Sequence, residues 1–265
     1  MKTHWQKFKK DPLYLIRYFG TSLLIGIAVV LLQAYLIEDW SSYQSLSIDW
    51  RGFLLLPIGL VIGVAIPALM HNCVHGNLRK RILNNIAGEL AGIYILLGMA
   101  AFELNHRMHH VYADTELDPH NPEGKKFFFF FFANNFGGTK PVLTKYLQFH
   151  GDTKKNRARF SLIVLLHFLN VPVRLMFWYF LLGPSLFLTF FVPSYLFHMF
   201  VFAHINYYTH ETNEEGKSVV FNFDSNLYYR FVNRFGSGVY FHANHHRNPN
   251  HYNPMKGAST SWLFR

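Results

Sequence analysis

Four apolar runs constrain the fold of this chain more than any other feature of its sequence. They occupy residues 14–37, 53–70, 160–182 and 185–203. A helix that crosses the hydrocarbon core of a bilayer needs about 20 mostly apolar residues, and each run meets or approaches that length. Charged residues make up 15% of the chain, whereas soluble domains average about 25%. We therefore predict an all-α integral membrane protein in which four transmembrane helices form two hairpins.

The basic residues between these runs predict their orientation. Four lysines lie within the first ten residues, a basic tripeptide follows the second run at 79–81, and a basic segment at 140–159 precedes the third run. Lys and Arg concentrate in cytoplasmic loops, so we expect both termini on the cytoplasmic side. A surface that faces anionic lipid explains the net charge of +10. No basic block resembles a nucleic-acid site, and nothing in the sequence indicates an oligomeric state.

A fifth apolar segment, residues 82–104, is also long enough to cross a membrane. A single crossing here would put His71 and His106 on opposite sides of the bilayer. Its two asparagines and two glutamates are also poor lipid-facing residues. We predict a helix or a bent pair of helices at the cytoplasmic interface. With no internal repeat or flexible linker, residues 1–265 are interpreted as one membrane-embedded domain.

A run of phenylalanines follows this segment. Residues 125–132 read "KKFFFFFF". Aromatic side chains and flanking lysines are typical of the membrane interface, which favours an interfacial anchor. The alternative is that these residues form a wall of a groove through which a lipid enters.

Histidines gather in three short clusters, "HNCVH", "HRMHH" and "HANHH", and one more ends "NYYTH" after the fourth run. On a helix, positions i, i+3 and i+4 share one face, so each cluster directs its imidazoles one way. The predicted topology brings all of them to the cytoplasmic side, where a helical cap would hold them. The candidate ligands are His71, His75, His106, His109, His110, His210, His242, His245 and His246.

Nine imidazoles exceed the needs of one metal ion. A structural zinc takes four protein ligands and a catalytic zinc three, whereas two ions with four or five ligands each would use all nine. Imidazole suits iron, copper, zinc and nickel, and iron is the metal of that group that activates O₂ for attack on C–H bonds. The lone Cys73 excludes an iron–sulfur cluster held by this chain alone. We predict two iron ions, with O₂ as co-substrate.

Carboxylates are expected beside the ligands, because a ligating histidine usually donates its other ring N–H to a carboxylate or carbonyl. Two of the candidates follow the second cluster directly. The candidates are Glu103, Asp114, Asp118 and Asp224.

At these motifs the chain resembles the membrane fatty acid desaturase/hydroxylase superfamily over residues 53–255. "HRMHHVYADTELDPHNP" resembles the second histidine box of acyl desaturases, while "NYYTHE" and "HANHHRNPNHY" are similar to alkane monooxygenases. "HNCVHG" is closer to desaturases and carotenoid ketolases. The resemblance implies that His210 is a ninth iron ligand and that Asn206 supports a metal-bound water. It also implies an acyl tunnel and an external electron donor of the ferredoxin, rubredoxin or cytochrome b5 type.

The predicted function is desaturation of a lipid acyl chain with O₂ and two electrons. Hydroxylation of an alkane or fatty acid, or oxidation of a carotenoid, would use the same site and stays open. A metal transporter or haem-binding membrane protein is the non-oxidative alternative. A transporter would hold polar ligands near the bilayer midplane, whereas these histidines collect at one face.

Overall fold

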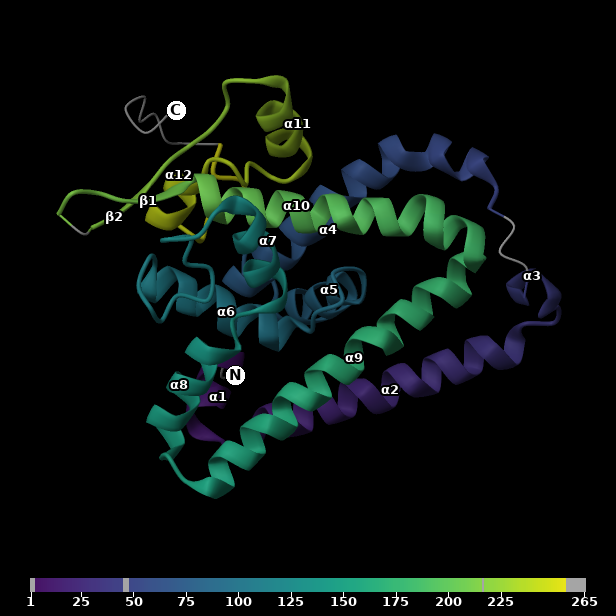
Figure 1. Cartoon of the computed structure of the whole chain (residues 1–265), viewed down its shortest axis with the longest axis horizontal. Coiled ribbons are helices and arrows are strands. Elements are labelled where there is room, and N and C mark those ends of the chain that lie inside the picture. The colour runs from purple at the N-terminus through teal and green to yellow at the C-terminus, as the bar shows by residue number, and fades with distance from the viewer. Residues whose placement is uncertain (1–2, 45–47, 216, 256–265) are drawn as a thin grey trace.

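The computed structural model describes residues 3–44, 48–215 and 217–255, which are mostly helical (Figure 1). This confirms a mainly helical protein, although a short two-stranded antiparallel ribbon departs from the all-α prediction. In chain order the elements are α1 (His4–Lys10), α2 (Tyr14–Leu36), α3 (Ser41–Gln44), a 3₁₀ segment (Trp50–Leu55), α4 (Leu56–His75), α5 (Arg81–Tyr94), α6 (Met99–Tyr112), α7 (Phe127–Phe136), α8 (Thr139–His150), α9 (Lys154–Leu186), a π-helical segment (Phe187–Phe191), α10 (Val192–Tyr208), β1 (His210–Thr212), β2 (Ser218–Val220), α11 (Leu227–Phe235) and α12 (His242–Arg247).

Three helical stretches of the described chain are long and apolar enough to cross a membrane: Tyr14–Leu36, Trp50–His75 and Lys154–Tyr208. The first two contain the runs predicted at 14–37 and 53–70, apart from the last residue of the first. The third joins the remaining two runs and breaks at Gly183, whose φ of 71° and ψ of 165° are readily reached only by glycine. Figure 1 shows α9 and α10 meeting at a sharp corner. Two crossings by this stretch stay a prediction.

The fifth apolar segment is a bent pair, as the sequence predicts. Helix α5 ends at Tyr94, α6 begins at Met99, and the two axes differ by 96°. Leu96 in the connection adopts a φ of 58°, which is uncommon for a residue with a side chain. The bend turns α6 so that its histidines approach those at the end of α4. The interfacial position of this pair stays a prediction.

Close packing holds α4 against α10. Helix α2 packs on α9, and α4 packs on both α5 and α10. A Cβ atom at Gly63 would lie 2.7 Å from the carbonyl oxygen of Ser194, so only glycine allows this approach of the two backbones. Figure 1 shows α6, α11, α12 and the β ribbon gathered at one end of the long helices. That end holds every predicted ligand.

Candidate metal centre

The first histidine group, called here the five-histidine group, consists of His71, His75, His106, His110 and His245. One ring nitrogen from each lies within 4.8 Å of the others. The Nε2 atoms of His75 and His106 are 2.8 Å apart, and those of His71 and His245 are 3.0 Å apart. Helices α4, α6 and α12 therefore aim their imidazoles at one point.

The second group, called here the four-histidine group, consists of His109, His210, His242 and His246. The Nε2 atom of His242 lies 3.1 Å from that of His210 and 3.2 Å from that of His246. Helices α6 and α12 contribute to both groups, while His210 is contributed by strand β1. All nine predicted histidines thus converge, divided five and four.

Asp118 fixes the ring of His109. The Nδ1–H of His109 donates to both carboxylate oxygens at 3.0 and 3.1 Å. The backbone N–H groups of Asp114 and His120 donate to the same carboxylate at 3.0 and 2.8 Å. The Asp118 side chain is fully buried, and burial raises its pKa, while the charge of His120 and the two backbone hydrogen bonds oppose that rise. Asp118 therefore orients His109 as a carboxylate beside a metal ligand does.

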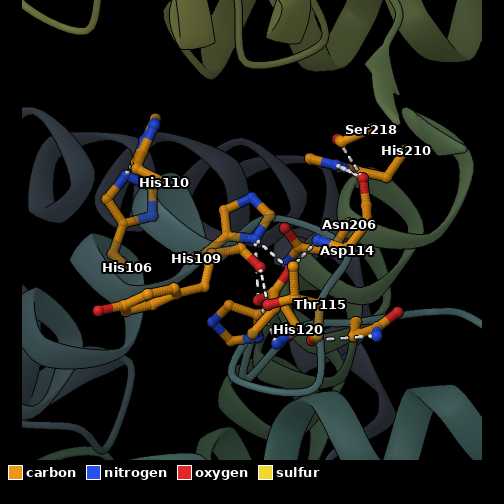
Figure 2. A network of polar contacts seen from close by, with 12 residues as sticks. His106, His109, His110, Asp114, Thr115, His120, Asn206, His210 and Ser218 are labelled. Carbon is orange, nitrogen blue, oxygen red and sulfur yellow. Dashed lines mark hydrogen bonds and ion pairs between the residues drawn. The ribbon is translucent and has the colours of Figure 1, made fainter. Parts of the chain in front are cut away.

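Asp114 plays the same part for His210. Its Oδ2 atom accepts from His210 Nδ1–H at 3.2 Å and from the Ser218 hydroxyl, and Figure 2 shows the carboxylate between the two. Asp114 has a φ of 60°, a left-handed conformation that Asp tolerates better than most residues. This turn brings its carboxylate to the β ribbon. Two of the four predicted supporting carboxylates thus contact candidate ligands.

The donor set fits metal ions. A neutral imidazole has one N–H and one lone pair, so donation of Nδ1–H to a carboxylate leaves the Nε2 lone pairs of His109 and His210 directed inward. His109 Nε2 is buried and has no hydrogen-bond partner. Converging lone pairs repel unless a cation or proton lies between them.

The three histidines of α12 meet a further requirement for ligation, since a ligand must be unprotonated. Burial, followed by the charges of neighbouring histidines, lowers the pKa of each well below its usual value. Their rings are therefore neutral at physiological pH. The residues are His242, His245 and His246.

An amide network lies beside the four-histidine group. Asn206 Nδ2–H donates to Asn134 Oδ1 at 3.3 Å and to the Phe202 carbonyl at 3.0 Å, and His120 Nδ1–H donates to the same Asn134 oxygen at 2.9 Å. The Asn134 Nδ2 group is buried without a partner. Asn134 was not among the predicted site residues, and its only signal in the sequence is a pair of asparagines after the phenylalanine run.

Two predicted carboxylates make different contacts. Glu103 accepts from the backbone N–H groups of His4 and Trp5 and pairs with Arg107 at 2.6 Å, so it anchors α1. Asp224 binds the amide of Asn233 near α11 at 3.4 Å. Neither carboxylate contacts a candidate ligand among these interactions, so a supporting role for Glu103 and Asp224 stays a prediction.

Residues 48–255 match the family model for fatty acid desaturases. The chain belongs to the fatty acid desaturase family. This confirms the predicted superfamily and supports an oxidoreductase of membrane lipids. No curated protein and no solved structure matches the chain at a significant level.

Two cavities reach the histidines of this desaturase-family chain. The larger has a volume of about 400 Å³ and is bordered by His106, His120 and His198. The smaller has a volume of about 70 Å³ and is bordered by ligand candidates of both groups. Phe102 and Phe202, whose ring centroids are 6.2 Å apart, border both cavities and form part of the wall between them.

Proposed function

We propose that this protein is an O₂-dependent di-iron desaturase that introduces a double bond into a lipid acyl chain. The observation that carries the proposal is the convergence of nine histidine nitrogens in two groups within a chain of the fatty acid desaturase family. The five-histidine group would hold one iron and the four-histidine group the other. Asn206, beside the second group, would support a water on that iron.

Iron bound there would supply the oxidation, in which two methylene hydrogens, one O₂, two electrons and two protons are converted into a double bond and two waters. The chain's own residues position the reactants. Asp118 and Asp114 hold His109 and His210 in one ring orientation and one tautomer. Buried ligands that are fixed in this way keep the site preorganised.

The larger cavity is the proposed acyl site. Ligand pockets usually measure about 300–1,000 Å³, and its volume of about 400 Å³ falls in that range. Its wall is mostly apolar, and it borders His106 of the five-histidine group and His120 of the amide network. A methylene pair held there would lie beside the proposed metals, shielded from bulk water.

Electrons must come from outside the site. One cysteine cannot hold an iron–sulfur cluster, so we propose an external donor such as a ferredoxin, a rubredoxin or a cytochrome b5. By the positive-inside rule, both termini and the metal site would face the cytoplasm. We further propose that residues 1–265 form one domain.

Product analysis tests the reaction. The purified protein, reconstituted with an electron donor, would receive a lipid with a deuterium-labelled acyl chain, and mass spectrometry would identify the products. Desaturation predicts loss of two hydrogens or deuteriums and no gain of oxygen. A product that carries one oxygen from ¹⁸O₂ would instead assign hydroxylation. No oxidised product with a complete electron supply would contradict both reactions.

A further inference from the structure

The larger cavity has an opening at its side. Phe136, at the end of α7, and Phe168, in α9, both border the cavity, yet they are 57% and 48% exposed. Residues that border a cavity and are also exposed mark its rim. Gly137, which is exposed and has no side chain, and the exposed Thr139 at the start of α8 extend the rim beyond α7. The cavity therefore opens between the end of α7 and α9.

The α9 side of this rim faces hydrocarbon. Phe168 lies in a candidate membrane span, and its neighbours Leu165 and Leu169 are 54% and 43% exposed. Apolar side chains exposed on a membrane-spanning helix lie against lipid. The rim on α9 is thus at the depth of acyl chains rather than in water.

Helix α7 indicates independently that the opening lies beside lipid. Phe128, Phe129 and Phe132 are 67%, 66% and 46% exposed, whereas Phe130 and Asn134 are buried. An exposed aromatic face preceded by two lysines is typical of a helix that lies in the membrane interface. The opposite face carries Asn134, which binds His120 beside the metal centre. Helix α7 therefore separates lipid from the site, and it ends at the opening.

The other cavity offers no equivalent route. Its volume is about 70 Å³, far below the roughly 300 Å³ of a small ligand pocket. The exposed His251 and Tyr252 form part of its border, and both belong to the cap rather than to a long apolar helix. Of these two cavities in the described part of the chain, the larger is the one with room for an acyl chain, and its rim faces lipid.

We propose that the substrate is the acyl chain of a bilayer glycerolipid, which enters sideways from the hydrocarbon through the opening between α7 and α9. A soluble acyl thioester arriving from the aqueous side is the alternative that the opening disfavours. The oxidation of this chain rests on the proposed function, whereas its entry and binding do not.

Photolabelling tests entry without any turnover. The full-length protein in phosphatidylcholine vesicles would receive either a phosphatidylcholine with a diazirine on one acyl chain or the same acyl chain as a coenzyme A thioester added from water. Peptide mass spectrometry would locate the adducts after irradiation. The proposal expects the phosphatidylcholine probe to label the cavity wall around Phe102 and Phe202. Interior labelling by the thioester alone, or by neither probe, would overturn it.

Two variants narrow the opening, and one variant is a matched control. Phe168→Trp and Phe136→Trp enlarge rim residues and should each reduce interior labelling several-fold. Leu165→Trp adds comparable bulk on the same lipid-facing side of α9 but does not border the cavity, so interior labelling should match the parent. Equal labelling in all three well-folded variants would overturn the route. Interior labelling here, combined with no oxidised product in the separate assay with a complete electron supply, would instead contradict the proposed function and leave the route standing.

Discussion

The two histidine groups are built differently although they share helices α6 and α12. The four-histidine group has two carboxylates, Asp118 on His109 and Asp114 on His210, and an amide network beside it. The five-histidine group has an additional imidazole, and no carboxylate contacts its rings among the interactions described. Its rings are held largely by packing, as in the stack of Phe102 on His106 at 5.6 Å.

The two groups therefore hold their imidazole rings in place by different means. A metal site is precise when each ring has one orientation and one tautomer. The four-histidine group achieves this with buried hydrogen bonds, and three of its four members are buried. The five-histidine group has three partly exposed members and relies on one ligand more. We therefore expect the four-histidine group to tolerate the loss of a ligand less well.

The largest effect is expected from removing one ligand in each group. His242→Ala leaves three histidines in its group, and His75→Ala leaves four in the other. We predict that His242→Ala loses about one iron per chain and all activity, while His75→Ala retains more iron. Elemental analysis of both purified variants measures this. Equal iron losses in the two variants would contradict the proposed difference between the two histidine groups.

Asp118→Asn tests the contribution of the carboxylate with little change in shape. The amide can present an N–H to His109 Nδ1, which favours the wrong tautomer. Loss of such a supporting carboxylate typically lowers metal affinity about 10–100-fold. Competition with a chelator would measure the loss, which should affect one of the two irons. If the chelator removed both irons from Asp118→Asn together, and at the concentration that removes them from the parent, Asp118 would have no specific role in the four-histidine group.

A smaller effect is expected for Asp114→Asn. Asp114 contacts His210 through one hydrogen bond at 3.2 Å, whereas Asp118 contacts His109 through both oxygens. In the same chelator titration, the metal affinity of Asp114→Asn should lie between that of the parent and that of Asp118→Asn. Ser218→Ala, which removes only the hydroxyl that donates to Asp114, should lie closest to the parent. A larger shift for Ser218→Ala than for Asp114→Asn would contradict this order.

Glu103→Ala should leave the iron content unchanged. The carboxylate holds α1 and Arg107 rather than a ligand, so its loss removes the partner of part-buried donors, at a cost of about 1 kcal/mol. Thermal unfolding should show the lower stability, with two irons still bound. Loss of iron in a folded Glu103→Ala protein would show that Glu103 supports the metal centre after all.

Helical spacing predicted which histidines converge but not how they divide. His109 and His110 are neighbours in sequence, yet consecutive helical residues point about 100° apart, and each joins a different group. That choice depends on where α12 and β1 dock, which no local pattern encodes. The long apolar helices were predictable because their length is set by the bilayer.

The carboxylates show the same limit. Asp118 was predictable because it follows its partner His109 by only nine residues, whereas Asp114 contacts His210, 96 positions along the chain, so its partner could not be read from the local spacing. The i,i+4 spacing of Glu103 to Arg107 predicts their ion pair, but the contact of Glu103 with α1 joins residues about 100 positions apart and follows from no local pattern. Asn134 could not be predicted from the sequence, because a single amide in an apolar run has no distinctive spacing. Its partners His120 and Asn206 also lie on other parts of the chain.

The most direct test of the di-iron centre is the metal content of the detergent-purified protein after expression with ample iron. Elemental mass spectrometry of the parent and of His109→Ala needs no substrate and no electron donor. The proposal predicts close to two irons per chain in the parent and clearly less in the variant. One zinc, a single iron held in haem, or no metal in the parent would contradict it.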